Sequence, residues 1–361
     1  MILNFDRDMF LELMTDGNLD LPIIWEGNNF KDTLDRKLQY YSDSLSNVVD
    51  KEDLKEIKRI SSLLVRVIRH YHNGLPTKAY DTFSRVMKTI IDKPIRIYQK
   101  TGEQSTIFQD DPLKLYRIRN VDEDREYLRK ELFHTPFFLR HKVDTCRYSI
   151  AGYPCLYLGT NMEVCRQEIR PVDSMTYTIA ARFRLVRNRS ENNGNDMKVI
   201  ELGVKPSHFL KYSNRNFNEE FENRFNEIDL MNQSVMYNYL YWYPLIVASS
   251  YIRKNKSDPF ASEYIIPQLL MQWVRIEVRK GNLYGLRYFS CASLEASEVG
   301  MNYVFPAYED EAVETDYCSV LSSCFSISKT LIFESHYDVT KAQRELDSYN
   351  DFSCVSARNF A

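Results

Sequence analysis

The hydrophobic positions of the N-terminal third recur at spacings of three and four residues, which is the period of an amphipathic helix. Residues 54–71 carry one apolar stripe of this kind, with lysine, arginine and glutamate between its members. Asn73-Gly74 marks the end of that helix, and Thr77 is placed to cap a second one. The pattern therefore predicts an antiparallel helical hairpin, with a further helix expected within residues 30–50.

The pattern changes after a polar stretch at residues 100–112, whose glycine, serine, aspartate and proline content is typical of a linker. Beyond this stretch, short alternating or apolar runs predict strands separated by a few helices. The strand candidates are 115–118, 155–158, 175–185, 199–202, 284–289 and 303–305, and the helix candidates are 162–169, 234–247 and 263–279.

The order of these elements is mixed and does not alternate regularly between strand and helix. It predicts an α+β fold with a mixed, largely antiparallel sheet. We expect a helical N-terminal domain at residues 1–107, a sheet-containing domain at 108–335 and a C-terminal helical tail at 336–361, which would serve as a lid or docking element.

Composition narrows the range of functions. The chain has 361 residues, 44% of them hydrophobic, which is enough for a substantial core, and a net charge of -3 gives no specific signal for nucleic-acid binding. Seven cysteines without a Cys-x-x-Cys pair argue against a disulfide framework and against a structural zinc site. No signal peptide or membrane span is expected, so the sequence predicts a cytoplasmic protein. No bound metal is expected either.

Several short motifs occur in a fixed order from residue 115 to residue 333. They are Tyr116-Arg117, Arg147-Tyr148, a turn at Gly152 with Pro154, Leu156-Tyr157-Leu158, a helix that reaches Glu168, Gly285-Leu286-Arg287-Tyr288-Phe289-Ser290, and Asn302-Tyr303-Val304-Phe305. As an ordered set they resemble the RES family, which is named for arginine, glutamate and serine and includes NAD⁺-degrading toxins of toxin–antitoxin systems.

The resemblance implies a fold similar to the ADP-ribosyltransferases, with NAD⁺ as a substrate and no prosthetic group. The implied activity is that of an NAD⁺ glycohydrolase or phosphorylase, which depletes cellular NAD⁺ as a toxin or defence effector. Breaking the nicotinamide–ribose bond builds positive charge on the ribose, and a nearby carboxylate stabilises that charge. The sequence has no Gly-x-Gly-x-x-Gly or Walker loop, so side chains and strand edges would have to hold the dinucleotide.

The resemblance also implies roles for individual residues. Glu168 would stabilise the ribose, Arg147 would bind the diphosphate, and Tyr157 would stack on nicotinamide or contact the ribose. These three are the expected catalytic residues. The expected NAD⁺-binding residues are Arg147, Tyr157, Ser290, Arg117, Tyr148 and His134.

Each expected site residue also has a structural interpretation. Glu168 could be an exposed residue close to Arg166 or Arg170, and Arg147 could form a surface ion pair with Asp144. Which arginine is the essential one stays open between Arg147, whose spacing fits better, and the arginine of the Tyr116-Arg117 pair.

The remaining candidates have structural interpretations as well. Tyr157 could be a core tyrosine of a central strand, and Ser290 could be a strand-end serine that binds nearby backbone. For His134, which precedes Thr135-Pro136, structural hydrogen bonding is the preferred interpretation.

Two other functions remain open from the sequence. One is ADP-ribosylation of a protein, and the other is a catalytically silent module that binds a nucleotide or a partner. The resemblance implies an antitoxin protein as a partner, whereas the N-terminal domain could instead restrain the enzyme in cis. A homo-oligomer is compatible with the sequence, which does not reveal the oligomeric state.

Overall fold

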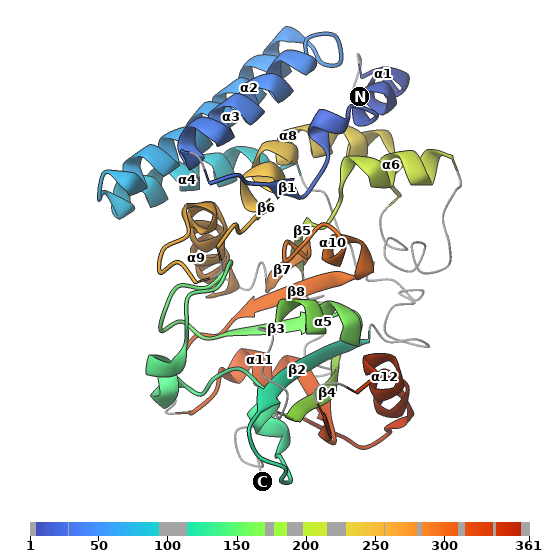
Figure 1. Ribbon diagram of the computed structural model, residues 1–361. Coiled ribbons are helices and arrows are strands. Elements are labelled where there is room, and N and C mark those ends of the chain that lie inside the picture. The colour runs from blue at the N-terminus through green and yellow to red at the C-terminus, as the bar shows by residue number, and fades with distance from the viewer. Residues whose placement is uncertain are drawn as a thin grey trace, which may run out of the picture. The chain divides into compact units, whose positions relative to one another are not determined.

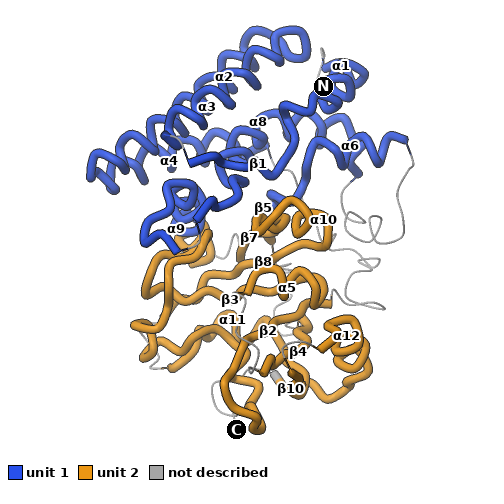
Figure 2. The backbone as a smooth tube through the Cα atoms, viewed as in Figure 1, with its two compact units in different colours: residues 1–98, 200–273 blue, residues 99–199, 274–361 orange. Residues whose placement is uncertain are grey.

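The computed structural model describes residues 5–27, 29–93, 114–169, 177–185, 198–214, 229–255, 257–279, 284–309, 315–334 and 337–354. The chain divides into two compact units, which Figure 2 shows in two colours. Unit 1 consists of residues 1–98 and 200–273, and unit 2 consists of residues 99–199 and 274–361. The predicted α+β fold with a helical N-terminus is confirmed, as Figure 1 shows.

Unit 1 is built mainly from helices, and the termini of several of them follow from local capping. Asp50 caps α3 by accepting hydrogen bonds from the backbone N–H groups of Glu52 and Asp53. α4 begins at Pro76 and not after Thr77, because proline suits the first helical position, where no N–H partner is needed. The helices are α1 Arg7–Met14, α2 Phe30–Ser44, α3 Lys51–His72, α4 Pro76–Ile90, α6 Pro206–Ser213 and α8 Gln233–Ser249, with 3₁₀ turns at Gly17–Leu19 and Ser262–Tyr264 and a parallel pair of β1 Ile23–Ile24 with β6 Tyr251–Ile252.

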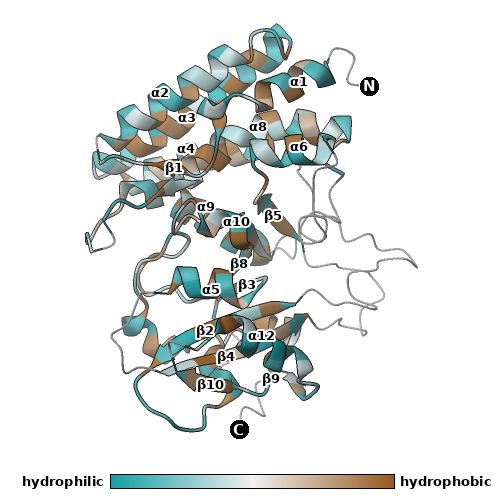
Figure 3. Cartoon of the chain, turned by 45° about the vertical axis from the view of Figure 1, so that its right-hand side comes forward, coloured by the Kyte–Doolittle hydropathy of each residue, from teal (hydrophilic) through white to brown (hydrophobic). Residues whose placement is uncertain are grey.

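The helix α8 forms the centre of unit 1. Its last eleven residues are all buried, so it is apolar on every side, whereas α2 and α3 mix hydrophilic and hydrophobic residues (Figure 3). Two buried tyrosines find hydrogen-bond acceptors: the Tyr41 hydroxyl donates to the Leu240 carbonyl at 2.7 Å, and the Tyr243 hydroxyl donates to the Leu19 carbonyl at 2.6 Å. These bonds join α8 to the N-terminal segments and satisfy both buried hydroxyls.

Unit 2 is organised around a nine-stranded sheet, whose last strand β5 starts at Val199 in unit 2 and continues into residues 200–202 of unit 1. Its order is β11-β9-β4-β2-β3-β8-β7-β5, and β10 also pairs with β4. Each pairing in this sheet for which the register is described is antiparallel. The strands are β2 Leu115–Val121, β3 Cys155–Gly159, β4 Tyr177–Leu185, β5 Val199–Leu202, β7 Gly285–Phe289, β8 Met301–Pro306, β9 Phe325–Ser328, β10 Leu331–Glu334 and β11 Phe352–Cys354.

Short helices connect these strands. They are α5 Met162–Glu168, α10 Ala296–Val299, α11 Ser319–Cys324 and α12 Val339–Ser348, with 3₁₀ turns at Arg129–Leu132 and Phe137–Lys142, and α9 Ile265–Arg279 runs across the boundary between the units. Within the described residues, no helix combines the length and the apolar character that crossing a membrane requires.

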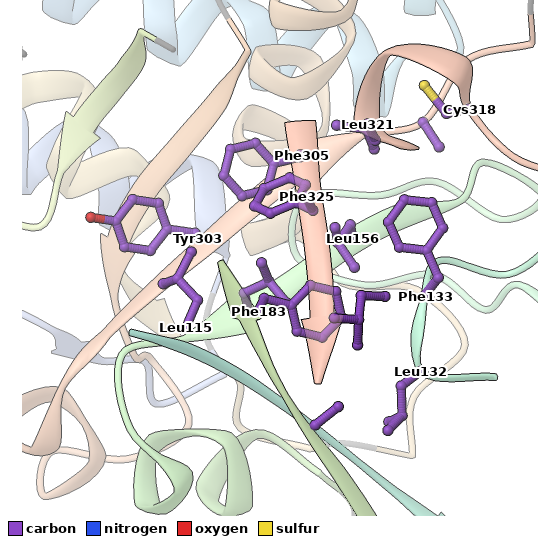
Figure 4. Close-up of a cluster of buried hydrophobic side chains, with 14 of the residues drawn as sticks. Leu115, Leu132, Phe133, Leu156, Phe183, Tyr303, Phe305, Cys318, Leu321 and Phe325 are labelled. Atoms are coloured by element: carbon purple, nitrogen blue, oxygen red, sulfur yellow. The ribbon is translucent and has the colours of Figure 1, made fainter. Parts of the chain in front are cut away.

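Alternate residues of the strands face two separate hydrophobic clusters. Leu156, Phe183 and Phe305 belong to the larger cluster, which Figure 4 shows in close-up. Tyr116 and Ile118 face the smaller cluster, to which α5 and α12 contribute. The strands β2 and β3 pair at the single position Tyr116↔Gly159, whereas β3 pairs with β8 over five residues.

The two units differ from the contiguous domains that the sequence suggests. Residues 200–273 belong with the N-terminal helices and not with a 108–335 domain, because the fully buried α8 forms the centre of that helical unit. The expected separate tail at 336–361 is likewise part of unit 2. Its helix α12 packs against α5, and β11 extends the sheet beside β9.

Candidate active site

The helix α5 is fixed at its first turn, which determines where its last residue lies. Asn161 caps the helix by accepting the Val164 N–H at 2.8 Å, and its own amide donates to the Val299 carbonyl at 2.8 Å. The side chain of Gln343 on α12 accepts the Met162 N–H at 2.9 Å. Two elements of unit 2, α10 and α12, therefore join the cap residue in setting the start of α5 and, with it, the position of Glu168 at the other end.

A glycine makes this close approach of helix and sheet feasible. A Cβ atom on Gly159, the last residue of β3, would lie 2.6 Å from both Cys165 Sγ and Val164 Cγ1. Such distances are far below van der Waals contact, so a larger residue would displace α5 from the sheet.

Glu168 lies against the ends of β7 and β8, where two buried side chains hold one of its oxygens. Glu168 Oε1 accepts a hydrogen bond from Ser290 Oγ at 2.6 Å and another from Asn302 Nδ2 at 2.8 Å. Ser290 Oγ also accepts the Ala292 N–H at 3.1 Å, so its own proton is directed to the carboxylate. Within the described residues, Glu168 Oε2 accepts no hydrogen bond, and Glu168 is exposed.

Aromatic side chains lie beside this carboxylate. The rings of Tyr148 and Tyr288 pack at a centroid distance of 4.6 Å, and both residues are buried. Burial raises the pKa of Tyr148, and the charges of Arg147 and Glu168 act on it in opposite directions. Burial also raises the pKa of Tyr288, with the charge of Glu168 and the neighbouring Tyr157 adding to the increase. Since the charges of Arg147 and Glu168 act on both tyrosines, and Tyr157 acts on Tyr288, these five residues lie in one neighbourhood.

Arg147 and Tyr148 lie in a tight turn. Cys146 and Ser149 form a two-way backbone pair, at 2.8 and 3.2 Å, which places Arg147 and Tyr148 at its tip. The Ser149 hydroxyl lies 3.0 Å from the Tyr157 hydroxyl, so the turn is also tied to β3. Ser149 had no expected role, because a serine between a tyrosine and an isoleucine carries no recognisable motif.

Arg117 supplies positive charge near the same site. Its guanidinium donates to the Phe133 carbonyl at 3.0 Å, and Arg119 donates to the same oxygen at 3.0 Å. Burial lowers the pKa of Arg117, the charge of Arg119 adds to that effect, and the neighbouring Tyr157 opposes it. Neither arginine has a carboxylate at ion-pair distance within the described ranges, which leaves a positive potential suited to an anionic ligand.

His134 lies apart from the carboxylate. It is fully buried, its Nδ1 lies 2.8 Å from the Thr135 carbonyl, and its Nε2 accepts the Cys318 N–H at 2.9 Å. Burial lowers its pKa to about 3. Both ring nitrogens are engaged by backbone, which favours the structural interpretation of this histidine over ligand binding.

The structure thus brings Glu168 and Ser290 into direct contact and places Arg147, Tyr148 and Tyr157 around them. It adds Asn302, whose role the sequence did not reveal because that role depends on the register that sets Asn302 opposite Tyr288. Glu168 is exposed, as its structural interpretation expected, but Arg166 bonds to Glu163 at 2.8 Å and not to Glu168. Arg170 lies outside the described residues.

The donor groups of this site suit an organic anion better than a metal. In the part of the chain that the structure describes, no group of three or more histidine, cysteine, aspartate or glutamate side chains is arranged to hold a metal ion. An oriented carboxylate beside aromatic rings and guanidinium groups can stabilise a developing cation and bind phosphate oxygens.

Comparison with known proteins gives one relative of note. The chain is 28% identical over 302 residues to a Bacillus subtilis (strain 168) protein named "Putative toxin YopC", an alignment that covers 80% of this chain and 62% of that protein. The similarity extends into both units, since neither unit alone makes up 80% of the chain. The chain spans less than two thirds of the relative's length. No family model and no solved structure matches the chain.

Proposed function

We propose that the protein cleaves the bond between nicotinamide and ribose in NAD⁺ and acts as a toxin or defence effector by depleting that molecule. The observation that carries the proposal is the geometry of Glu168, an exposed residue in which Ser290 and Asn302 hold Oε1 while Oε2 accepts no hydrogen bond within the described residues. The name of the Bacillus subtilis relative supports the toxin part of the proposal. An antitoxin protein and NAD⁺ are the partners that follow from it.

The chemistry requires a group that stabilises positive charge. When the bond breaks, its electron pair moves to the ring nitrogen, which releases neutral nicotinamide and leaves an oxocarbenium-like ribose. Glu168 Oε2 would stabilise this sugar or hold one of its hydroxyls, because Oε1 is already occupied by two donors. Water then gives ADP-ribose and a proton, whereas phosphate gives the 1-phosphate of ADP-ribose.

Two arginines are available for the diphosphate. Arg117 is half-buried, shares the Phe133 carbonyl with Arg119 and lies near Tyr157, and Arg147 lies at the turn beside Tyr148. A guanidinium fork matches two phosphate oxygens. The absence of a carboxylate at ion-pair distance from Arg117, within the described ranges, favours it for the diphosphate and Arg147 for contacts nearer the ribose.

The test is release of nicotinamide from NAD⁺ by the purified protein, with and without phosphate, comparing wild type with Glu168→Gln. We expect the substitution to lower turnover about 10²–10³-fold, because it removes the charge that stabilises the transition state. Glu163→Gln is the matched control: Glu163 lies on the same helix, pairs with Arg166 and should leave turnover unchanged. A wild-type protein without turnover, or a Glu168→Gln protein with full turnover, would contradict the proposal.

The products identify the acceptor. Turnover of NAD⁺ alone indicates water, and a phosphorylated product that appears only with phosphate indicates phosphorolysis. Nicotinamide release together with labelling of protein from NAD⁺ labelled in its ADP-ribose part, without free ADP-ribose or its 1-phosphate, would instead indicate ADP-ribosylation. In cells, expression of wild type should lower NAD⁺ and stop growth, whereas Glu168→Gln should do neither.

A further inference from the structure

Unit 1 contains a polar groove between α2 and α3. Its volume is about 330 Å³, within the size range of small-ligand sites. Residues of both helices line it, among them Asp35 and Gln39 on α2 and Ser62, Arg66 and Arg69 on α3.

The floor of the groove departs from ordinary helix packing. Two helices of a hairpin normally meet through apolar side chains. Leu38 and Val65 follow this rule, but Ser42 and Ser61 occupy positions that are 3% and 6% exposed. The Ser42 hydroxyl bonds to the Leu38 carbonyl, whereas the Ser61 hydroxyl is buried without a hydrogen-bond partner among the residues that the structure describes. An unpaired buried hydroxyl costs stability, and a ligand in the groove can offset that cost.

The rim has a second unusual feature, which is uncompensated charge on α3. Lys58 at one end pairs with Asp43 at 3.3 Å, and Arg59, which lies outside the groove, pairs with Glu56 at 2.7 Å. Arg66 and Arg69 have no ion-pair partner within the described residues, although they lie three positions apart on the same helix face, where like charges repel.

We propose that this groove binds a small hydroxylated phosphate ester, the chemistry shared by nucleoside and sugar monophosphates. Arg66 and Arg69 match a phosphate group, whose charge removes their mutual repulsion. Across the groove, Asp35 and Gln39 offer acceptors for sugar hydroxyls. Leu38 and Val65 provide an apolar surface for the ring. The site is independent of the proposed cleavage of NAD⁺, and its occupant would report a metabolic state to the helical unit.

The proposal is tested by calorimetric titration of the full-length protein with AMP, ribose 5-phosphate and adenosine. We expect the phosphate-bearing compounds to bind and adenosine to bind at least tenfold more weakly. Affinity should fall with rising salt concentration, since the guanidinium groups are exposed. AMP binding without ribose 5-phosphate binding identifies a nucleotide site, and equal binding of both identifies a sugar phosphate site.

The double variant Arg66→Gln/Arg69→Gln should weaken binding of the phosphate compounds at least tenfold, and Ser62→Glu, which places negative charge at the same rim, should do likewise. Arg59→Gln is the control on the same helix and should bind as wild type does. Undiminished binding in both groove variants would place the site elsewhere, for example at the proposed NAD⁺ site, and would overturn the proposal. So would no binding of either phosphate compound to wild type, or equal binding of adenosine and AMP.

Discussion

Asp53 in unit 1 and Glu168 in unit 2 are carboxylates that accept hydrogen bonds from two side chains each, but they differ in the oxygen that remains. Both oxygens of Asp53 accept the Tyr237 hydroxyl, at 2.8 Å each, and Tyr241 bonds to the same carboxylate. Among the described residues, only Oε1 of Glu168 accepts a hydrogen bond. Both oxygens of Asp53 are therefore engaged within the fold, whereas one oxygen of Glu168 is not engaged by any described residue.

The positions of the two residues on their helices give the same contrast. Asp53 lies in the first turn of α3, where the helix dipole favours negative charge. The Lys93 ammonium also lies 4.0 Å from the centroid of the Tyr241 ring, whose hydroxyl bonds to Asp53. Glu168 is the last residue of α5, where the dipole disfavours negative charge. A carboxylate held at a helix end that disfavours its charge is consistent with the proposed role of Glu168, because functional residues are often held in places that do not stabilise the fold.

The comparison predicts, first, that Asp53→Ala destabilises unit 1 strongly. The substitution leaves the hydroxyls of Tyr237 and Tyr241 without their acceptor, and bonds to a charged group contribute about 1.5–3 kcal/mol each, so we expect a loss of about 3 kcal/mol. Urea unfolding followed by circular dichroism measures it. Asp81→Ala, at an exposed position of α4, is the control and should change the free energy of unfolding by about 0.5 kcal/mol or less. Equal effects of the two substitutions would remove the contrast between Asp53 and an ordinary surface acid.

Second, Asn302→Ala should affect catalysis rather than binding. Without the Asn302 amide, Glu168 loses one of two donors and can rotate, so we expect kcat for NAD⁺ cleavage to fall about tenfold to a hundredfold with KM nearly unchanged. Steady-state kinetics at several NAD⁺ concentrations separate the two constants. Asn120→Ala on β2 is the control, because Asn120 bonds to Thr178. A raised KM with an unchanged kcat would show that Asn302 contacts the substrate instead.

The sequence predicted the helices that carry Asp53 and Glu168 better than it predicted the contacts that these residues make. The stripe of residues 54–71 is regular enough to predict α3, and Glu168 falls at the end of a helix that the pattern also predicts. The contact between Ser290 and Glu168 joins residues 122 positions apart, which no local pattern encodes. Only the resemblance to a family brought these two residues into one hypothesis.

The grouping of residues 200–273 with the N-terminal helices could not be predicted for a similar reason. Hydrophobic periodicity shows that α8 is a helix, and its apolar character on all sides shows that it is buried. Neither property names the partner that buries it. That information lies in tertiary contacts, such as the bond from the Tyr41 hydroxyl to the Leu240 carbonyl, which connect distant parts of the chain.

Third, His134 extends the comparison to a side chain whose two ring nitrogens are both engaged by backbone groups. Burial lowers its pKa from 6.5 to about 3, so the unfolded chain binds a proton below pH 6.5 that the folded chain does not. Stability should therefore be complete above pH 6.5 and fall as the pH is lowered toward 3, by about 2 kcal/mol at pH 5. Urea unfolding of wild type and His134→Gln at pH 7 and pH 5 measures this contribution. A histidine that binds NAD⁺ would instead give a variant with the wild-type pH dependence of stability and a raised KM.

The smallest expected effect concerns Asn161, which sets the position of Glu168 from the opposite end of α5. Asn161→Ala removes the cap bond to the Val164 N–H and the bond to the Val299 carbonyl, for which we expect a loss of about 1 kcal/mol in the free energy of unfolding. Asn161→Asp keeps the cap acceptor and removes only the amide donor. If α5 holds Glu168 in place, kcat should fall further in Asn161→Ala than in Asn161→Asp, because the first turn of the helix loosens only in the former. Equal kcat in both variants would mean that Ser290 and Asn302 alone fix the carboxylate, whatever happens at the start of its helix.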